Sequence, residues 1–314
     1  MRTALLLLTL GCGEPKTNAP ADTSAQDEDT GRVESPSTWT WTPPDDAPDL
    51  ALDVVQDAAQ QGISAVTTVN PMVLYEAYDE AIGHGNNQCP NPYAATGWKI
   101  GWSNDCFTND GWGFSGRSET AWRHDMSIEG RAIEDYGEFI TNALLTSPAG
   151  ETTGGGTFDM EGYGELWTWT DDDGVHAESW LFGTFRHEGN WLDPSWLDAG
   201  ASISLTTTSL DQGDGTRVIT AQGGISRTGT MPDGTVGLLV DGLTVVQTAT
   251  GCTASGLLTV QGTGGQRITV DLTEADATDG VACSACGAAM REGEDQGEVC
   301  VDLSAMLDWE GRPW

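Results

Sequence analysis

The sequence predicts a mainly β protein: an antiparallel meander, sandwich or curved sheet, with two short N-terminal helices and stabilising disulfides. Two patterns support this class. No helical pattern separates the predicted strands, as parallel βαβ units would require. Asp-Gly pairs between alternating apolar residues are strong hairpin signals, because a type I′ turn needs positive φ at both central residues. Such pairs recur at 173–174, 214–215, 233–234, 241–242 and 279–280.

Cysteine usage is the third observation. Apart from Cys12, the chain has six cysteines, an even number that in an exported chain indicates three disulfides. We pair Cys89 with Cys106, which are close in sequence and far from the rest. The other four allow three pairings, of which we favour Cys286–Cys300 across a hairpin and Cys252–Cys283. A zinc or redox site at the single CxxC motif, Cys283 to Cys286, is the alternative.

The first residues form a short apolar run, Ala4–Leu10, after Arg2. A membrane-spanning helix needs about 20 apolar residues, whereas the core of an export signal needs about 7–15. Gly11-Cys12 ends the run, and this junction resembles a bacterial lipoprotein signal, in which the cysteine is lipidated and becomes the new N-terminus. The resemblance implies a signal peptide at 1–11, lipid on Cys12 and a protein anchored in the cell envelope, on the periplasmic or surface face of the outer membrane. The alternative is a plain secretion signal with an incidental cysteine.

Residues 12–47 are rich in Pro, Thr, Ser, Asp and Glu and contain few aliphatic residues. Such a segment cannot bury enough apolar surface to fold, so we expect a disordered acidic tether. The whole chain has 48 acidic against 13 basic residues and a formal charge of −35. This charge repels phosphate backbones and argues against nucleic acid as a partner.

A helical and loop-rich cap, with the Cys89–Cys106 bond, is expected over residues 48–121. Its first helix is predicted over about Pro48–Gln61, because Pro48 suits a first turn and Gly62 suits a C-terminal stop. A second helix is predicted over about Pro71–Ile82.

An antiparallel β domain is expected over residues 122–314. Two Asp-Gly pairs eight residues apart predict a meander with strands at about Ile225–Pro232, Thr235–Val240 and Leu243–Gln247. The stretch Ala132–Leu145 is ambiguous between strand and helix.

The common catalytic signatures HExxH, GxSxG and GxxxxGK[ST] do not occur in the sequence, so we predict no catalytic residue and no metal site. Calcium is the ion that the sequence favours most among cofactors. Asp171, Asp172 and Asp173 crowd into one turn with Glu178 close by, but the EF-hand spacing is not met. We favour a solvated hairpin tip over a calcium site.

Tryptophans flanking this turn give the one candidate binding site. With Asp173-Gly174 as the turn centre, Trp167 lies opposite Trp180 and Trp169 lies opposite Glu178. Alternation then places on one face Trp167, Trp169, Trp180, Asp171, His176, Glu178 and Glu165. Flat rings beside carboxylates and an imidazole can stack on a sugar and bond its hydroxyls. The alternative is that the tryptophans are core residues, because Trp buries a large area.

The chain as a whole resembles acidic, cysteine-paired lipoproteins of proteobacteria. The resemblance depends on the Gly11-Cys12 junction, the polar tether and the stretches CSACG and GEVCVD near the C-terminus, and it implies no particular activity. We therefore expect an envelope lipoprotein with a non-catalytic β domain that is structural or binds a glycan or protein at the cell surface. A secreted polysaccharide hydrolase with a carboxylate pair is the alternative.

Overall fold

The computed structural model describes residues 49–68, 81–94, 100–103, 105–128, 130–149, 155–189, 201–226, 231–272, 283–307 and 309. The chain divides into two units, Met1–Trp41 and Thr42–Trp314, and every described residue belongs to the second. The predicted signal peptide, Cys12 and the tether lie outside the described residues. None of the described helices is both long and apolar enough to span a membrane.

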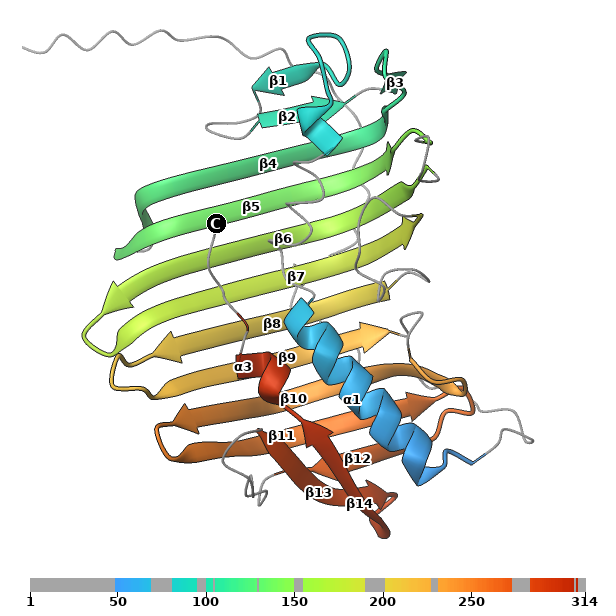
Figure 1. Ribbon diagram of the computed structural model, residues 1–314, viewed down its shortest axis with the longest axis vertical. Helices are drawn as coiled ribbons and strands as arrows, with labels where there is room; N and C mark the ends of the chain where they lie inside the picture. The colour runs from blue at the N-terminus through green and yellow to red at the C-terminus, as the bar shows by residue number, and fades with distance from the viewer. Residues whose placement is uncertain are drawn as a thin grey trace, which may run out of the picture. The chain divides into compact units, whose positions relative to one another are not determined.

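One large open sheet of 14 antiparallel strands dominates the second unit (Figure 1). This confirms the predicted mainly β class and its curved-sheet option. Neighbouring strands follow one another along the chain almost throughout, as in a meander, except that β3 pairs beside β2 on β4. The strands are β1 Pro92–Ala94, β2 Ile100–Ser103, β3 Cys106–Phe107, β4 Gly113–Ile128, β5 Arg131–Thr146, β6 Thr157–Asp171, β7 Gly174–Glu188, β8 Ala201–Asp211, β9 Arg217–Ser226, β10 Thr235–Thr248, β11 Gly251–Gly262, β12 Arg267–Asp271, β13 Ser284–Arg291 and β14 Glu294–Asp302.

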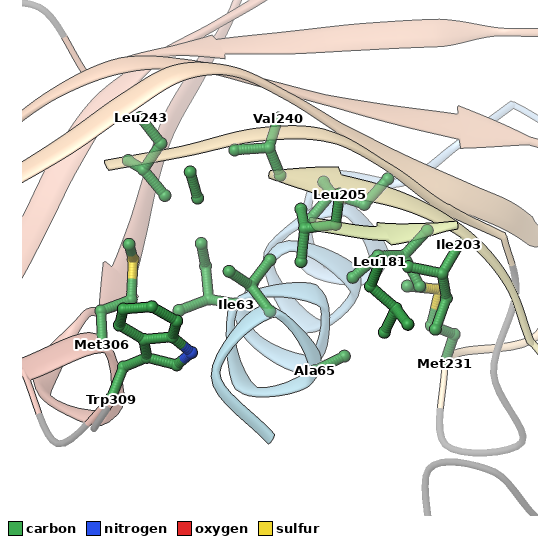
Figure 2. Close-up of a cluster of buried hydrophobic side chains, with 14 of the residues drawn as sticks. Ile63, Ala65, Leu181, Ile203, Leu205, Met231, Val240, Leu243, Met306 and Trp309 are labelled. Carbon is green, nitrogen blue, oxygen red and sulfur yellow. The ribbon is translucent and has the colours of Figure 1, made fainter. Parts of the chain in front are cut away.

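Helix α1, Leu52–Thr68, packs across one face of this sheet, against β9, β10, β11 and β14. Its apolar residues recur at helical spacing and are buried: Val55, Ala58, Ala59, Ile63 and Val66. Strand side chains point toward this helix, as Figure 2 shows for Leu181, Leu205 and Val240. The short helix α3, Ser304–Leu307, adds Met306 to the same core. The part of the core on β9–β11 therefore lies between α1 and this sheet face, and the same cluster continues along β4–β8.

The predicted C-terminal stop of the first helix at Gly62 is wrong, because α1 continues through Gly62 to Thr68. A Cβ atom at Gly62 would lie 2.2 Å from Leu238 Cδ2 of β10. The glycine thus allows the helix to approach the sheet closely, and this packing outweighs its poor helix propensity. Most of the predicted second helix lies outside the described residues, although residues 81–83 are helical.

The Asp-Gly pairs behave differently from one another. The pairs at 173–174, 214–215 and 233–234 lie at or beside the ends of strands, whereas the pair at 279–280 is outside the described residues. The predicted turn at 241–242 is wrong, because β10 runs through it. The pairing of β10 shifts at this point against both β9 and β11, and Gly242 has φ of 60°. Asp241-Gly242 therefore forms a β-bulge, and two predicted strands are one.

The predicted division at residues 121 and 122 is also corrected. Strand β4 passes through this position, so the strands of the predicted cap and those of the predicted β domain share one sheet. Helix α1, placed in the cap, packs on β9 to β11 and β14. The ambiguous stretch Ala132–Leu145 is a strand, within β5.

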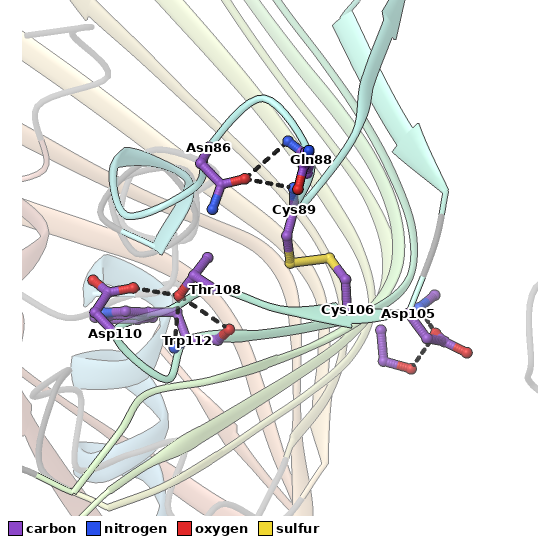
Figure 3. The surroundings of a disulfide bond; sticks show 10 residues. Asn86, Gln88, Cys89, Asp105, Cys106, Thr108, Asp110 and Trp112 are labelled. Atoms are coloured by element: carbon purple, nitrogen blue, oxygen red, sulfur yellow. Dashed lines mark hydrogen bonds between the residues drawn. A yellow bond between two sulfur atoms is a disulfide. The ribbon is translucent and has the colours of Figure 1, made fainter.

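All three predicted disulfides are present: Cys89–Cys106, Cys252–Cys283 and Cys286–Cys300. Because Cys283 and Cys286 belong to different disulfides, the zinc and CxxC redox alternatives are not supported. Figure 3 shows Cys89–Cys106 joining the loop before β1 to β3. Asn86 Oδ1 accepts bonds from the backbone N–H groups of Gln88 and Cys89, at 2.8 and 3.0 Å, which orders the loop that carries the disulfide.

Candidate binding face

The face of the sheet opposite α1 carries the candidate site. Side chains alternate between faces along a strand, and Phe139, Leu181 and Phe185 point into the core cluster that also contains the buried residues of α1. Their neighbours in β5, β6 and β7 therefore point to the other side, which we call the open face. It includes Tyr136, Glu138, Tyr163, Glu165, Trp167, Trp169, His176, Glu178, Trp180 and Phe182. The predicted binding residues Trp167, Trp169, His176, Glu178 and Trp180 are all among them.

The register between β6 and β7 differs from the predicted one. Asp171 pairs with Gly174, so the two-residue turn is Asp172-Asp173 and not Asp173-Gly174. Trp180 consequently lies opposite Glu165, and Trp167 lies opposite Glu178. The predicted Trp167–Trp180 pair is therefore wrong. The slip amounts to two residues along the strand, and because side chains alternate with a period of two, the predicted face is unchanged.

Trp169 is enclosed by its neighbours. Its cross-strand partner His176 stacks on the ring, with centroids 4.7 Å apart and planes 6° apart. The Arg131 guanidinium, from β5 on the other side of β6, lies 4.4 Å from the ring centroid, a cation–π contact. Trp169 also packs in a small cluster with Ile133 and Tyr136 and is only 8% exposed. Both residues of the stack are therefore occupied within the protein.

Trp180 presents the accessible ring of the predicted set. Its side chain is 51% exposed, and its indole N–H donates to Glu178 Oε1 at 2.6 Å. This bond fixes the orientation of the ring relative to the strand. Trp167 is partly buried and packs obliquely against Tyr136, with centroids 6.0 Å apart.

Two carboxylates lie directly opposite each other beside this ring. Glu138 of β5 pairs with Glu165 of β6, and they are 9% and 8% exposed. Like charges in this position repel, and two phenols offset the repulsion. Tyr136 donates to Glu138 Oε2 at 3.1 Å, and Tyr163 donates to Glu165 Oε2 at 2.5 Å.

The same environment keeps both phenols protonated. Burial is the largest cause that raises the pKa of Tyr136 above its ordinary range, and the neighbouring carboxylates of Glu165 and Glu138 raise it further. The pKa of Tyr163 is raised by the same causes in the same order. Both phenols therefore keep the proton that they donate to Glu138 and Glu165.

Phe182 extends the aromatic surface along β7 and is 65% exposed. Beyond it the open face turns to neutral polar residues, on strands β8 and β9. Thr208 bonds Thr220 between these strands, and Thr184 Oγ1 lies 3.0 Å from Ser202 Oγ. The open face thus combines exposed aromatic rings, carboxylates and several neighbouring hydroxyl groups.

Two depressions, both open to solvent, lie along this face. One, of about 580 Å³, lies among β6, β7, β8 and β9, and includes Glu161, Tyr163, Phe182, Thr184, Ser202 and Ser204. The other, of about 720 Å³, adjoins Arg117, Glu119, Ile140 and Asn142 on β4 and β5. Both volumes lie in the range of small-molecule sites. The second is bordered by the ion pair of Arg117 with Glu119.

The acidic turn considered for calcium is held by internal bonds. Asp171 Oδ1 accepts from the backbone N–H of Asp173 at 2.9 Å and lies 2.8 Å from His176 Nε2. The hydrogen bond with His176 and that from Asp173 lower the pKa of Asp171. Glu178, the fourth carboxylate considered, is engaged by Trp180. These contacts are those of a well-ordered hairpin tip.

Sequence reasoning missed several residues of this face: Tyr136, Glu138, Tyr163, Phe182 and the hydroxyls of β8. The alternation in GYGELW of β6 carries part of the signal, since it places Tyr163 with Glu165 and Trp167. In the sequence, the stretch that forms β5 is ambiguous between strand and helix, so its side chains were not assigned to a face.

Comparison of the chain with protein-family models, with curated proteins and with solved structures finds no match in any of the three.

Proposed function

We propose that this protein is an envelope-anchored lipoprotein whose β domain is non-catalytic and binds a surface glycan through the open face. The observation that carries the proposal is the half-exposed Trp180 ring, held in place by Glu178. A fixed ring can stack on the C–H face of a sugar, while adjacent carboxylates and hydroxyls bond its polar groups. Binding of this kind needs no cofactor. The partners are then the membrane, through lipid on Cys12, and a glycan, with no role for nucleic acid.

The binding part of the proposal is tested by a screen. The full chain, produced in an exporting host, is applied to immobilised glycans and to cell-wall fractions. We expect retention on at least one glycan and release by the soluble form of the same glycan. Retention on none of them, or retention that only a protein component of the fraction explains, contradicts the glycan assignment.

The anchoring part depends on Gly11-Cys12. Growth with an alkynyl fatty acid should label the wild-type chain and leave Cys12→Ser unlabelled. The Cys89→Ser variant, which removes a different cysteine, is the control and should still be labelled. Labelling of the Cys12→Ser chain, or no labelling of the wild type, contradicts lipidation at Cys12.

A polysaccharide hydrolase is the second candidate, and the opposed Glu138 and Glu165 are the observation that favours it. Paired carboxylates are the usual acid and base of glycoside hydrolysis. However, both side chains are more than nine-tenths buried and accept bonds from tyrosines, which suits a structural role. Release of reducing sugar from a bound glycan, abolished by Glu165→Gln, would establish the hydrolase instead.

A further inference from the structure

We infer that the depression beside Phe182 is a second sugar subsite, so that the ligand is an oligosaccharide of uncharged sugars running along β7 from Trp180 to Phe182. This inference rests on the proposed glycan-binding function and adds a site, a ligand class and a direction to it.

The shape of the depression follows from one row of residues across the sheet. Consecutive partners in this row are Tyr163, Phe182, Ser204, Gly224 and Leu239. The side chains of this row are therefore large at the first two positions, small at the third, absent at the glycine and large again at the last. The small residues Ser204 and Gly224 leave a hollow beside Phe182, which is 65% exposed. Leu239 closes the row, because a Cβ at Gly224 would lie 3.0 Å from Leu239 Cδ2. The resulting hollow measures about 580 Å³, enough for a sugar ring.

The lining chemistry fits a neutral sugar. Phe182 and Tyr163 supply aromatic carbon on one side. Hydroxyl groups that can both donate and accept lie on Thr184, Ser202 and Ser204. Glu161 adds one acceptor at the edge. A stacked ring with several hydroxyls matches this set, whereas a purely apolar ligand would leave the hydroxyls unpaired.

Charge argues against anionic sugars. Glu161 borders the hollow, and Glu165 and Glu178 lie next to Trp180. The whole chain carries a formal charge of −35. A uronic acid or phosphorylated sugar would meet like charge at each of these positions. The ligand class is therefore an uncharged glycan.

The hollow and the Trp180 ring lie along one strand. Trp180 and Phe182 are two residues apart on β7 and point to the same face, which separates them by roughly 7 Å. A chain of sugars lying along β7 can contact both. A single sugar occupies one of them, so affinity should grow with the length of the ligand until both are filled.

The test uses the full chain in affinity electrophoresis through gels that contain a neutral polysaccharide: a β-1,4-glucan, a β-1,3-glucan, an α-1,4-glucan or a mannan. Sodium alginate serves as the polyanionic comparison. Ser204→Tyr fills the hollow from a strand position that tolerates an aromatic residue. Thr253→Tyr makes a matched change at an exposed position of β11, remote from the hollow. We expect Ser204→Tyr to weaken binding at least tenfold and Thr253→Tyr to leave it unchanged.

Ligand length gives an independent readout. A tetrasaccharide of the bound polysaccharide should compete at least tenfold better than its monosaccharide against the wild type, and this advantage should disappear in Ser204→Tyr. Alginate should not retard the protein at physiological salt. If Ser204→Tyr lowers the Tm, the milder Ser202→Ala and Glu161→Gln replace it, and each should weaken binding severalfold.

The outcomes separate the inference from the function on which it rests. The second subsite is refuted, and glycan binding by the open face is retained, if Trp180→Ala loses binding and Ser204→Tyr binds like the wild type. The same conclusion holds if both replacement variants bind like the wild type. Equal competition by monosaccharide and tetrasaccharide refutes it in the same way. If alginate retards the protein and no neutral polysaccharide does, the uncharged ligand class is refuted. If no polysaccharide retards the wild type, both the subsite and the proposed function fall.

Discussion

Gln60 of α1 and Asp302 of β14 are joined by two hydrogen bonds in which a side-chain amide substitutes for a neighbouring strand. Gln60 Nε2 donates to the carbonyl oxygen of Asp302 at 3.0 Å, and the Asp302 N–H donates to Gln60 Oε1 at 2.7 Å. Strand β14 is the last strand of the sheet, and unpaired edge groups invite aggregation. We expect Gln60→Ala to destabilise the fold by about 1–2 kcal/mol in urea denaturation. Gln56→Ala, at an exposed position one turn earlier, is the control and should change stability little.

The carboxylate of Asp302 also makes the stability of the fold depend on pH. Its carboxylate accepts from the backbone N–H of Ser304 at 2.9 Å, and the bonds from the hydroxyl and backbone of Ser304 lower its pKa below 3.8. Because the pKa is lower in the folded state than in the unfolded state, the unfolded state binds more protons. This contribution is present above the unfolded pKa and is lost as pH falls through the folded pKa.

Asp105 acts in the same direction, since bonds from Ser115 and Gly116 lower its pKa. We therefore expect the free energy of unfolding to decrease as the pH is lowered from about 5 to about 2. Asp302→Asn should make this decrease shallower in urea titrations across that range. An unchanged pH dependence in this variant contradicts the assigned contribution.

Tyr136 is expected to stabilise the buried carboxylates. Removing its hydroxyl leaves Glu138 without one donor in a mostly buried position. Tyr136→Phe should therefore cost about 1–3 kcal/mol in chemical denaturation, although it retains the ring. Phe139→Tyr cannot serve as the control, because Phe139 is a core residue. The comparison variant is Tyr163→Phe, which removes the same type of bond from a half-buried ring and should lose less stability. No loss in either variant would mean that the phenols do not stabilise the acidic pair.

A substitution at Thr141 is expected to raise the free energy of unfolding, whereas the previous substitutions lower it. Its hydroxyl is buried and has no hydrogen-bond partner among the described residues. Thr141→Val keeps the shape and removes the unpaired polar group, so we expect a gain of about 1 kcal/mol in unfolding free energy. The control is Thr208→Val, which removes the bond to Thr220 and should destabilise. Destabilisation of both variants to the same extent contradicts the account of Thr141.

Short-range patterns in the sequence predicted the β class, the three disulfides and the face of the tryptophans. These features depend on local turn residues, on cysteine spacing and on the two-residue period of a strand. The face survived a register error between β6 and β7 because the error was two residues and not one.

Features that depend on distant contacts were not predicted. Gly62 signals a helix end by propensity, yet the contact with Leu238 keeps it inside α1. Asp241-Gly242 signals a turn, yet β9 and β11 pair on both sides of it and hold β10 extended. The opposed Glu138 and Glu165 depend on the pairing of β5 with β6. Each of these outcomes is decided by residues far away in the chain.

The central claim is that the open face binds a glycan through Trp180, and one comparison tests it most directly. Trp169→Ala removes a buried, stacked ring and should cost about 3–5 kcal/mol. Trp180→Ala removes a half-exposed ring, and the loss of its cross-strand contacts should cost about 0.2–1 kcal/mol.

The decisive measurement is therefore the affinity of Trp180→Ala for the glycan that retains the wild type, determined at a temperature where melting curves show both to be fully folded. The account predicts a Tm within a few degrees of the wild type and at least a tenfold loss of affinity. A folded Trp180→Ala that binds as tightly as the wild type would contradict the claim, and so would a variant that fails to fold, because the ring would then belong to the core.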